Sequence, residues 1–90
     1  MPTPTMSMYE SIDAGCENLG RRYKLTDREV EIVKLLSKGR SKSYIAETLF
    51  ISENTVRTHA RHIYRKLNVH SKQEILDMIT GDEKQNSAKE

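Results

Sequence analysis

The chain has 90 residues, 36% of them hydrophobic, which is enough apolar material for one small domain with short tails. Its single cysteine, Cys16, excludes an intramolecular disulfide and argues against a thiolate metal cluster. The longest apolar runs have two or three residues, far short of the roughly 18 that a membrane-spanning helix needs. The first residues lack the basic and apolar regions of a signal peptide, so we expect a cytoplasmic protein.

The net charge of +2 is unevenly distributed along the sequence. Basic residues far outnumber acidic ones between positions 38 and 66, whereas the rest of the chain is acidic on balance. Such a segment is typical of a surface that binds a polyanion and equally of a solvated helix face, so charge alone leaves both interpretations open. The bases are Lys38, Arg40, Lys42, Arg57, Arg61, Arg65 and Lys66, and the acids are Glu47 and Glu53.

The N-terminal part begins with a flexible lead-in over residues 1–6, and a helical segment follows over 7–23. Ser7 and Glu10 have the spacing of a capping box, so the helix itself should cover about residues 8–22. Two glycines inside this stretch lower its helical propensity. The apolar residues that recur at helical intervals are Ile12, Cys16, Leu19 and Tyr23, and the glycines are Gly15 and Gly20.

Residues 24–80 show the start and stop signals of four more helices. Thr26 and Glu29 form a second capping box, which opens a helix that should end at Gly39. A short helix over 43–49 begins at Ser41 or Ser43.

The later signals define a long helix and a final one. Ser52 caps the long helix over 53–67, and Asn68 ends it in the left-handed conformation. Ser71 and Glu74 open a final helix over 71–80, closed by Gly81 before a disordered tail at 81–90. No segment has the alternation of a strand, so we expect an all-α bundle of four to five helices.

The long helix has one apolar and one cationic face. At about 100° of rotation per residue, the apolar positions occupy a narrow sector and the basic positions lie well away from it. Together with the short helix over 43–49 it has the arrangement of a helix-turn-helix, whose second helix enters the major groove of DNA. The apolar positions are Val56, Ala60, Ile63 and Leu67, and the polar ones are Arg57, Thr58, Arg61 and Arg65.

Three runs of residues at fixed spacing resemble the LuxR-type (GerE-like) DNA-binding domain of bacterial transcription regulators. They are Leu25-Thr26-x-Arg28-Glu29-x-Glu31-Ile32-Val33-x-Leu35-Leu36-x-x-Gly39, Ile45-Ala46-x-x-Leu49-x-Ile51-Ser52-x-x-Thr55-Val56-Arg57-x-His59, and Ile63-Tyr64-x-Lys66-Leu67-x-Val69. The resemblance implies a four-helix domain that binds DNA as a dimer, usually at the C-terminus of a longer protein. It is closest to the branch that carries an N-terminal multi-pass membrane region, so the native protein is expected to be tethered to a membrane.

The resemblance places base-reading residues on the outer face of the long helix, at Arg57, Thr58 and Arg61. We expect flanking residues to contact phosphates, namely Lys42, Ser43, Ser52, Thr55, His59, Arg65 and Lys66. The last helix carries more apolar residues than one packing face uses, and it is the expected dimer contact. Those residues are Ile75, Leu76, Met78 and Ile79.

Other functions remain open at this stage. A sigma-factor region-4-like domain would bind promoter DNA and polymerase, and a protein-interaction module would use the basic helix to bind an acidic partner. RNA polymerase is a further possible partner in the regulator interpretation. His59 and His62 lack a third metal ligand nearby, and no nucleophile, base and acid share a sensible spacing. We therefore expect no metal, cofactor, small-molecule ligand or enzymatic activity, and a small buried side chain at Cys16.

Overall fold

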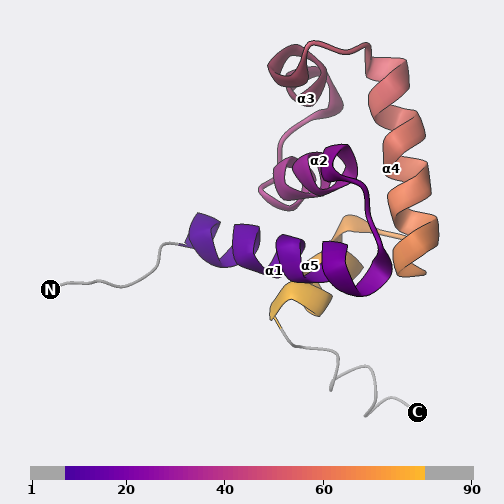
Figure 1. Cartoon of the computed structure of the whole chain (residues 1–90). Coiled ribbons are helices and arrows are strands. Elements are labelled where there is room, and N and C mark those ends of the chain that lie inside the picture. The colour runs from indigo at the N-terminus through magenta and orange to yellow at the C-terminus, as the bar shows by residue number, and fades with distance from the viewer. Residues whose placement is uncertain (1–7, 81–90) are drawn as a thin grey trace, which may run out of the picture.

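The computed structural model describes residues 8–80, which form five helices and no strand (Figure 1). The helices are α1 (Met8–Tyr23), α2 (Asp27–Ser37), α3 (Lys42–Leu49), α4 (Glu53–Leu67) and α5 (Lys72–Thr80). The all-α class expected from the sequence is confirmed. The lead-in, Ser7 of the first predicted capping box, Gly81 and the predicted tail lie outside the described residues.

The helices begin where side chains satisfy their first N–H groups. The Thr26 hydroxyl accepts from the Glu29 N–H at 3.1 Å, and Glu29 Oε1 accepts from the Thr26 N–H at 2.9 Å, which completes the predicted capping box. Ser41, not Ser43, caps α3, so that helix starts at Lys42, one residue before the predicted boundary. Ser52 caps α4 as predicted.

The start of α5 differs in one detail from a reciprocal capping box. The Ser71 hydroxyl accepts from the Glu74 N–H at 3.3 Å, as expected. The Glu74 carboxylate, however, accepts from the N–H of His70 at 3.1 Å, one residue earlier than a capping box requires. The hydrogen bond between His70 and Glu74 therefore ties the loop between α4 and α5 to the start of α5.

Three of the helices end in a left-handed residue, namely α1 at Lys24 (φ 61°), α3 at Phe50 and α4 at Asn68. Asn68, with φ 59° and ψ 47°, closes α4 in the predicted conformation, and its N–H donates to the Arg65 carbonyl at 3.2 Å. Phe50 closes α3 with φ 60° and ψ 45°, a conformation that the sequence did not indicate for a large apolar residue. The Phe50 turn gives the chain its sharp change of direction between α3 and α4.

A single core joins all five helices. Each helix supplies at least one side chain with no solvent exposure, so α1 belongs to the same packed unit as the four helices that follow it. The fully enclosed residues are Cys16 from α1, Ile32 and Val33 from α2, Ile45 from α3, Val56 and Ile63 from α4, and Ile75 from α5. The small Ala46, 6% exposed, lies in this core on α3.

The two glycines of α1 permit close helix packing. A Cβ atom at Gly20 would lie 2.6 Å from Val30 Cγ2 of α2, and one at Gly15 would overlap Ile79 Cγ2 of α5. The two glycines lower the intrinsic helical propensity of this segment, yet α1 forms over its whole predicted length. Their missing side chains allow α2 and α5 to approach it.

Helix α4 runs along one side of the molecule (Figure 1). Helix α3 stands beside its N-terminal end, and the turn between α1 and α2 lies beside its C-terminal end. The packing of α3 against α4 across a short turn has the form of a helix-turn-helix. Helix α4 is thus held at both ends while its outer face stays open.

Candidate nucleic-acid interface

The two faces of α4 have separate environments, as the sequence predicts. Val56 and Ile63 are fully buried in the core, and Ala60 and Leu67 are almost so. Arg57, Arg61 and Arg65 are exposed and form no ion pair with any residue between 8 and 80. Three guanidinium groups are therefore available to an anionic partner on a helix whose position the core fixes.

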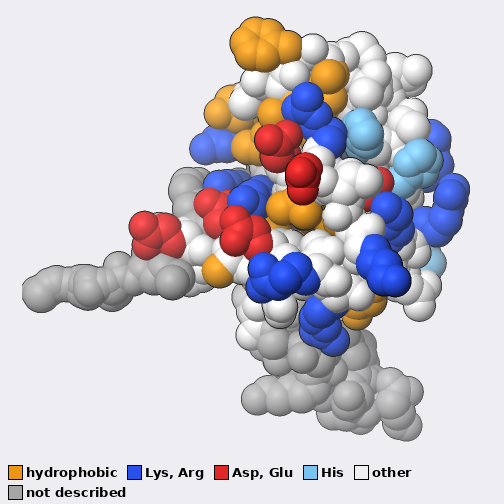
Figure 2. Space-filling view, in the orientation of Figure 1, with side chains coloured by type: hydrophobic (Ala, Val, Ile, Leu, Met, Phe, Trp, Pro, Cys, Tyr) orange, Lys and Arg blue, Asp and Glu red, His pale blue; other side chains and the backbone are white. Residues whose placement is uncertain are grey.

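Charge is unevenly distributed on the surface (Figure 2). In this view Lys, Arg and His side chains gather along the side occupied by α4, and Asp and Glu side chains appear mainly over α1 and α2. Several acidic side chains of that region are neutralised locally, for example by the Lys34–Glu17 pair at 2.8 Å and the Lys38–Asp13 pair at 2.8 Å. Arg57, Arg61 and Arg65 of α4 have no such partner among residues 8–80.

Hydroxyl groups cluster at the N-terminus of α4. Ser52 Oγ accepts from the Thr55 N–H at 3.0 Å and donates to Thr55 Oγ1 at 2.9 Å. Both residues are exposed, so their oxygens lie at the positive end of the helix dipole on the solvent side. This end of α4 is suited to an anion such as a phosphate.

Thr58 and His59 follow on the half-buried borders of the open face. The Thr58 hydroxyl donates to the Asn54 carbonyl at 3.1 Å, which occupies its proton and leaves its methyl group for an outside contact. The Nδ1 atom of His59 is enclosed and has no hydrogen-bond partner among the described residues. Only Nε2 of that ring is therefore suited to an external phosphate.

The N-terminus of α3 forms a second basic region. Lys42 and Ser43 are exposed in its first turn, which contains no acidic residue. Arg40, which the sequence reasoning left out of the site, precedes this turn with its guanidinium 5.1 Å from the centre of the Tyr44 ring. Tyr44 stands at the third position of α3, where a Glu would complete a capping box with Ser41. An aromatic residue four positions after Arg40 was the sequence signal for this contact.

The structure gives Lys66 a partner inside the protein, and its contact with phosphate stays a prediction. Its Nζ donates to Glu29 Oε1 at 2.8 Å and to the Lys24 carbonyl at 3.3 Å. Burial by itself would raise the pKa of Glu29, but the hydrogen bonds from Lys66 and from the Thr26 N–H outweigh it and lower that pKa. Lys66 therefore fastens the C-terminal end of α4 to the start of α2.

The predicted dimer surface on α5 needs one correction. Ile75 is fully buried in the core and cannot contact another molecule. Met78 and Ile79 pack partly against the core, and Leu76 is half-buried. Leu76 and Ile79 line, with Ile12 of α1, a mainly apolar hollow of about 460 Å³ between α1 and α5.

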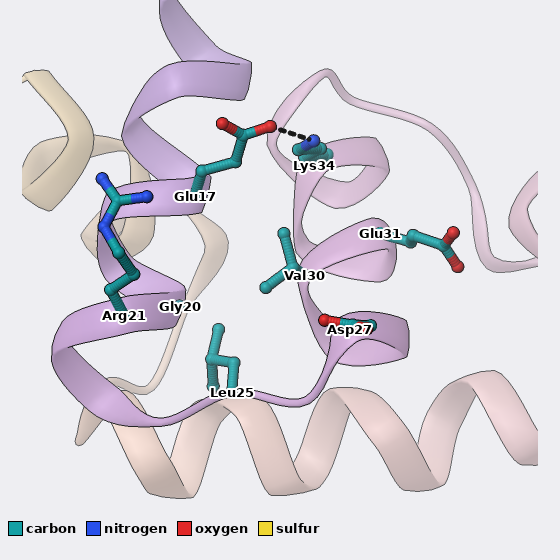
Figure 3. Close-up of a pocket in the computed structure, with 8 residues that line it drawn as sticks. All are labelled: Glu17, Gly20, Arg21, Leu25, Asp27, Val30, Glu31 and Lys34. Carbon is teal, nitrogen blue, oxygen red and sulfur yellow. Dashed lines mark hydrogen bonds and ion pairs between the residues drawn. The ribbon is translucent and has the colours of Figure 1, made fainter.

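Another hollow of about 470 Å³ lies between α1 and α2 and includes no residue of α4 (Figure 3). Leu25 and Val30 are its apolar residues, and the Glu17–Lys34 ion pair spans from one helix to the other. Side chains of both charges surround it, so it offers no single charge to an ionic ligand. It is separate from the basic face.

Other chemistry has little support in residues 8–80. No group of three or more His, Cys, Asp and Glu side chains there is arranged to hold a metal ion. Cys16 is enclosed, and burial raises the pKa of its thiol to about 11. None of the described helices is long and apolar enough to cross a membrane.

Comparison with known proteins identifies the domain. Residues 23–79 match the bacterial regulatory proteins of the luxR family. The chain belongs to this family. Its helix-turn-helix is thus the DNA-binding output domain of a transcription regulator, and α1 lies almost entirely before the matched region.

Individual relatives are named as response regulators or regulatory proteins. The chain is 39% identical over 72 residues to the response regulatory protein YgeK of Escherichia coli, a match that covers 76% of this chain and 49% of YgeK. It is 52% identical over 48 residues to a nitrate/nitrite response regulator homolog of Haemophilus influenzae (53% of this chain, 23% of that protein). It is 47% identical over 53 residues to the oxygen regulatory protein NreC of Staphylococcus carnosus (59% and 24%).

The chain spans half or less of the length of these curated relatives. No solved structure matches it significantly.

Proposed function

We propose that this chain binds duplex DNA in a sequence-specific manner, with α4 in the major groove. The exposed, unpaired arginines on the outer face of α4 carry this proposal, because their helix is fixed by the core on its other side. Its 15 residues correspond to roughly 22 Å at 1.5 Å per residue. That length exceeds the groove width of about 12 Å, so the helix also reaches the flanking phosphates.

The residues on this face divide between base and phosphate contacts. Arg57 and Arg61 donate bidentate hydrogen bonds to guanine O6 and N7, and the methyl group of Thr58 contacts a thymine methyl. The phosphate contacts set affinity and salt dependence and carry no sequence information. We assign them to Lys42, Ser43, Ser52, Thr55, His59 and Arg65. Lys66, predicted as a further phosphate contact, already donates to Glu29, so we expect it to contribute little.

Dimerisation on a two-half-site DNA is the second part of the proposal. Leu76, Met78 and Ile79 of α5 supply the apolar contact, and a twofold axis would bring the two copies of this surface together. Sedimentation of the domain on a duplex with two half-sites should give two copies per duplex. A strict monomer under those conditions would remove the dimer from the proposal.

The setting of the full-length protein is also proposed by analogy with the relatives. Several relatives are named response regulators, so we place this chain in the cytoplasm as the output part of a signal-responsive regulator. The membrane-tethered branch stays a prediction. A sigma-factor-like domain, the alternative left open by the sequence, has no support among these relatives.

Salt-titrated binding to a fluorescent duplex of random sequence tests DNA binding directly. Neutralising about two to four phosphates per domain should make log affinity fall with log salt at a slope of about −2 to −4. A flat response, or no binding at low salt, would reject the proposal. Selection of bound duplexes from a random pool should then yield a defined half-site and a defined spacing.

A further inference from the structure

The end of α1 and the turn that follows it carry a cluster of positive charge. Arg21, Arg22 and Lys24 are three bases within four positions, and all three are exposed. Residues 18–26 contain no acid. Arginines in the last turn of a helix stabilise its dipole, so the two arginines need no external partner on that ground alone. Their pairing and their place beside α4 distinguish this cluster from an ordinary helix end.

The cluster differs in pairing from the bases that follow it along α2. Arg28, Lys34 and Lys38 each form an ion pair with an acid of α1 or α2, at 3.1, 2.8 and 2.8 Å. Arg22 and Lys24 form no ion pair with any residue between 8 and 80. Positive charge without an acidic partner therefore gathers at the end of α1.

Hydrogen bonds fix this end of α1 against the C-terminal end of α4. The Lys24 carbonyl accepts from Nζ of Lys66, in the last turn of α4, at 3.3 Å. The Leu25 N–H donates to the Gly20 carbonyl at 3.0 Å, which closes α1 around the left-handed Lys24. Both bonds use main-chain atoms of the turn, so the Lys24 side chain stays available on the surface. In Figure 2 the Lys and Arg side chains continue from the side of α4 to the region where α1 ends.

Arg21 is set apart from the other two bases by its direction. In Figure 3 its side chain runs along α1 toward Glu17 and away from α4, the helix that crosses the lower part of the view. Arg22 follows about 100° further around the helix, with its guanidinium 5.6 Å from the centre of the Tyr23 ring, a contact that holds the side chain without neutralising it. Lys24 lies in the turn that contacts α4. We call Arg22 and Lys24 the basic end of α1.

We propose that the basic end of α1 binds the phosphate backbone of the DNA that flanks the segment read by α4, an inference that rests on the proposed function. The 15 residues of α4 correspond to roughly 22 Å, against a groove about 12 Å wide. The C-terminal end of α4, and the turn that it contacts, therefore lie at the phosphates bordering the groove. Guanidinium and ammonium groups form charge-assisted hydrogen bonds with such phosphates.

This contact gives α1 a role beyond packing. The family match begins at residue 23, so nearly all of α1, including Arg22, precedes the matched domain. The core encloses Cys16 and Leu19 of α1, so the helix is already held in place before DNA binds. A contact from a preordered helix avoids the entropy cost of ordering a flexible arm. The basic end should thus lengthen the DNA segment covered by one domain and add affinity without base preference.

Binding to duplexes of two lengths tests the proposal. One duplex ends at the edges of the half-site selected by this chain, and the other extends about one helical turn of DNA beyond each edge. Salt-titrated fluorescence anisotropy measures both affinities. Replacing Arg22 and Lys24 together by glutamine should weaken binding to the longer duplex by about tenfold at low salt and reduce the magnitude of its salt slope by about two. Binding to the shorter duplex should stay within about twofold of the wild type, because the flanking phosphates are missing.

Single variants separate contact from overall charge. Lys24→Gln and Arg22→Gln should each reduce the magnitude of the slope on the longer duplex by about one, whereas Lys24→Arg should keep the wild-type slope. Arg21→Gln is the matched control, because it removes the same charge from the same turn but on a side chain that points away from α4. It should leave both slopes unchanged. All these side chains are exposed, so the melting temperatures should stay close to that of the wild type.

Several outcomes would overturn the proposal. An unchanged slope for the double variant on the longer duplex would show that the basic end does not contact DNA. Equal losses for Arg21→Gln and Lys24→Gln would show a general effect of charge without a defined contact. Equal weakening on both duplexes would place the contact inside the half-site, not on the flanking DNA. Failure of the wild-type chain to bind either duplex would instead refute the proposed DNA-binding function itself, and this inference with it.

Discussion

Lys66, in the last turn of α4, donates a 2.8 Å hydrogen bond to Glu29, which is only 3% exposed near the start of α2. The same carboxylate oxygen accepts from the Thr26 N–H at 2.9 Å. One buried carboxylate therefore both caps α2 and anchors the recognition helix. The N-terminal end of α4 is held separately by its packing against α3, so the two anchors together fix the direction of the helix.

Breaking this pair should destabilise the domain. Lys66→Met keeps the apolar stem and removes the charge, leaving Glu29 buried with one donor fewer, and we expect a loss of about 1–3 kcal/mol in the free energy of unfolding. Glu29→Gln should cost a similar amount. Urea unfolding of both single variants and the double variant should show a coupling of about 1–2 kcal/mol. Additive losses would show that the two side chains do not stabilise each other.

The same variant tests whether Lys66 contacts DNA. Lys66→Met should leave the salt slope of binding to random duplex unchanged, because its charge is committed to Glu29. Arg65→Ala, one residue earlier and unpaired, should reduce the magnitude of that slope by about one. A reduced slope for Lys66→Met would return Lys66 to the phosphate contacts.

The lowered pKa of Glu29 predicts a loss of stability in acid. Burial opposes the charged form, but the Lys66 and Thr26 hydrogen bonds outweigh it, so the folded state holds the proton less tightly than the unfolded state, whose pKa is near 4.5. The contribution is therefore complete above pH 4.5 and is lost as the pH falls through the lower folded-state pKa. Melting temperatures between pH 3 and 7 should fall less steeply for Glu29→Gln than for the wild type. Parallel profiles would contradict the assignment.

Local signals in the sequence predicted most of the fold. Capping residues act on N–H groups two or three positions away, so Thr26, Ser52 and Ser71 mark helix starts without knowledge of the tertiary structure. The same holds for Asn68, whose short polar side chain suits a left-handed end. Periodicity likewise separated the buried and open faces of α4.

Features that depend on a neighbouring element could not be predicted in this way. Periodicity places Lys66 on the border of α4 but does not reveal that Glu29 of α2 faces it. It places Ile75 on an apolar stripe without showing that the core encloses it completely. The exposure of Phe50 depends in the same way on a turn whose conformation disfavours its own residue type.

The arginines of α4 should separate into two kinds of contact. Arg61→Ala should cost about 1–3 kcal/mol on the selected site and relax base preference, because it removes a bidentate contact to a base. Arg65→Ala should weaken selected and random duplexes alike. Arg28→Ala, an exposed arginine of α2 paired with Glu31, is the matched control and should change neither. Equal effects of Arg61→Ala and Arg65→Ala on both duplexes would refute the division of roles.

The packing of α1 against α5 gives a prediction that opposes helix propensity. Gly15→Ala would ordinarily stabilise a helix by up to about 1 kcal/mol. The new Cβ would overlap Ile79 Cγ2, however, and forcing the two helices apart should cost about 1–3 kcal/mol, so the net change should be destabilising.

Ile79→Ala, which removes that methyl group, provides the compensating variant. Ile79→Ala alone should be destabilising, yet Gly15→Ala should be less harmful in its presence than in the wild type. Thermal unfolding of the four proteins measures this coupling. A Gly15→Ala variant more stable than the wild type would show that α1 does not pack closely on α5. The hollow between these two helices would then not have the shape described above.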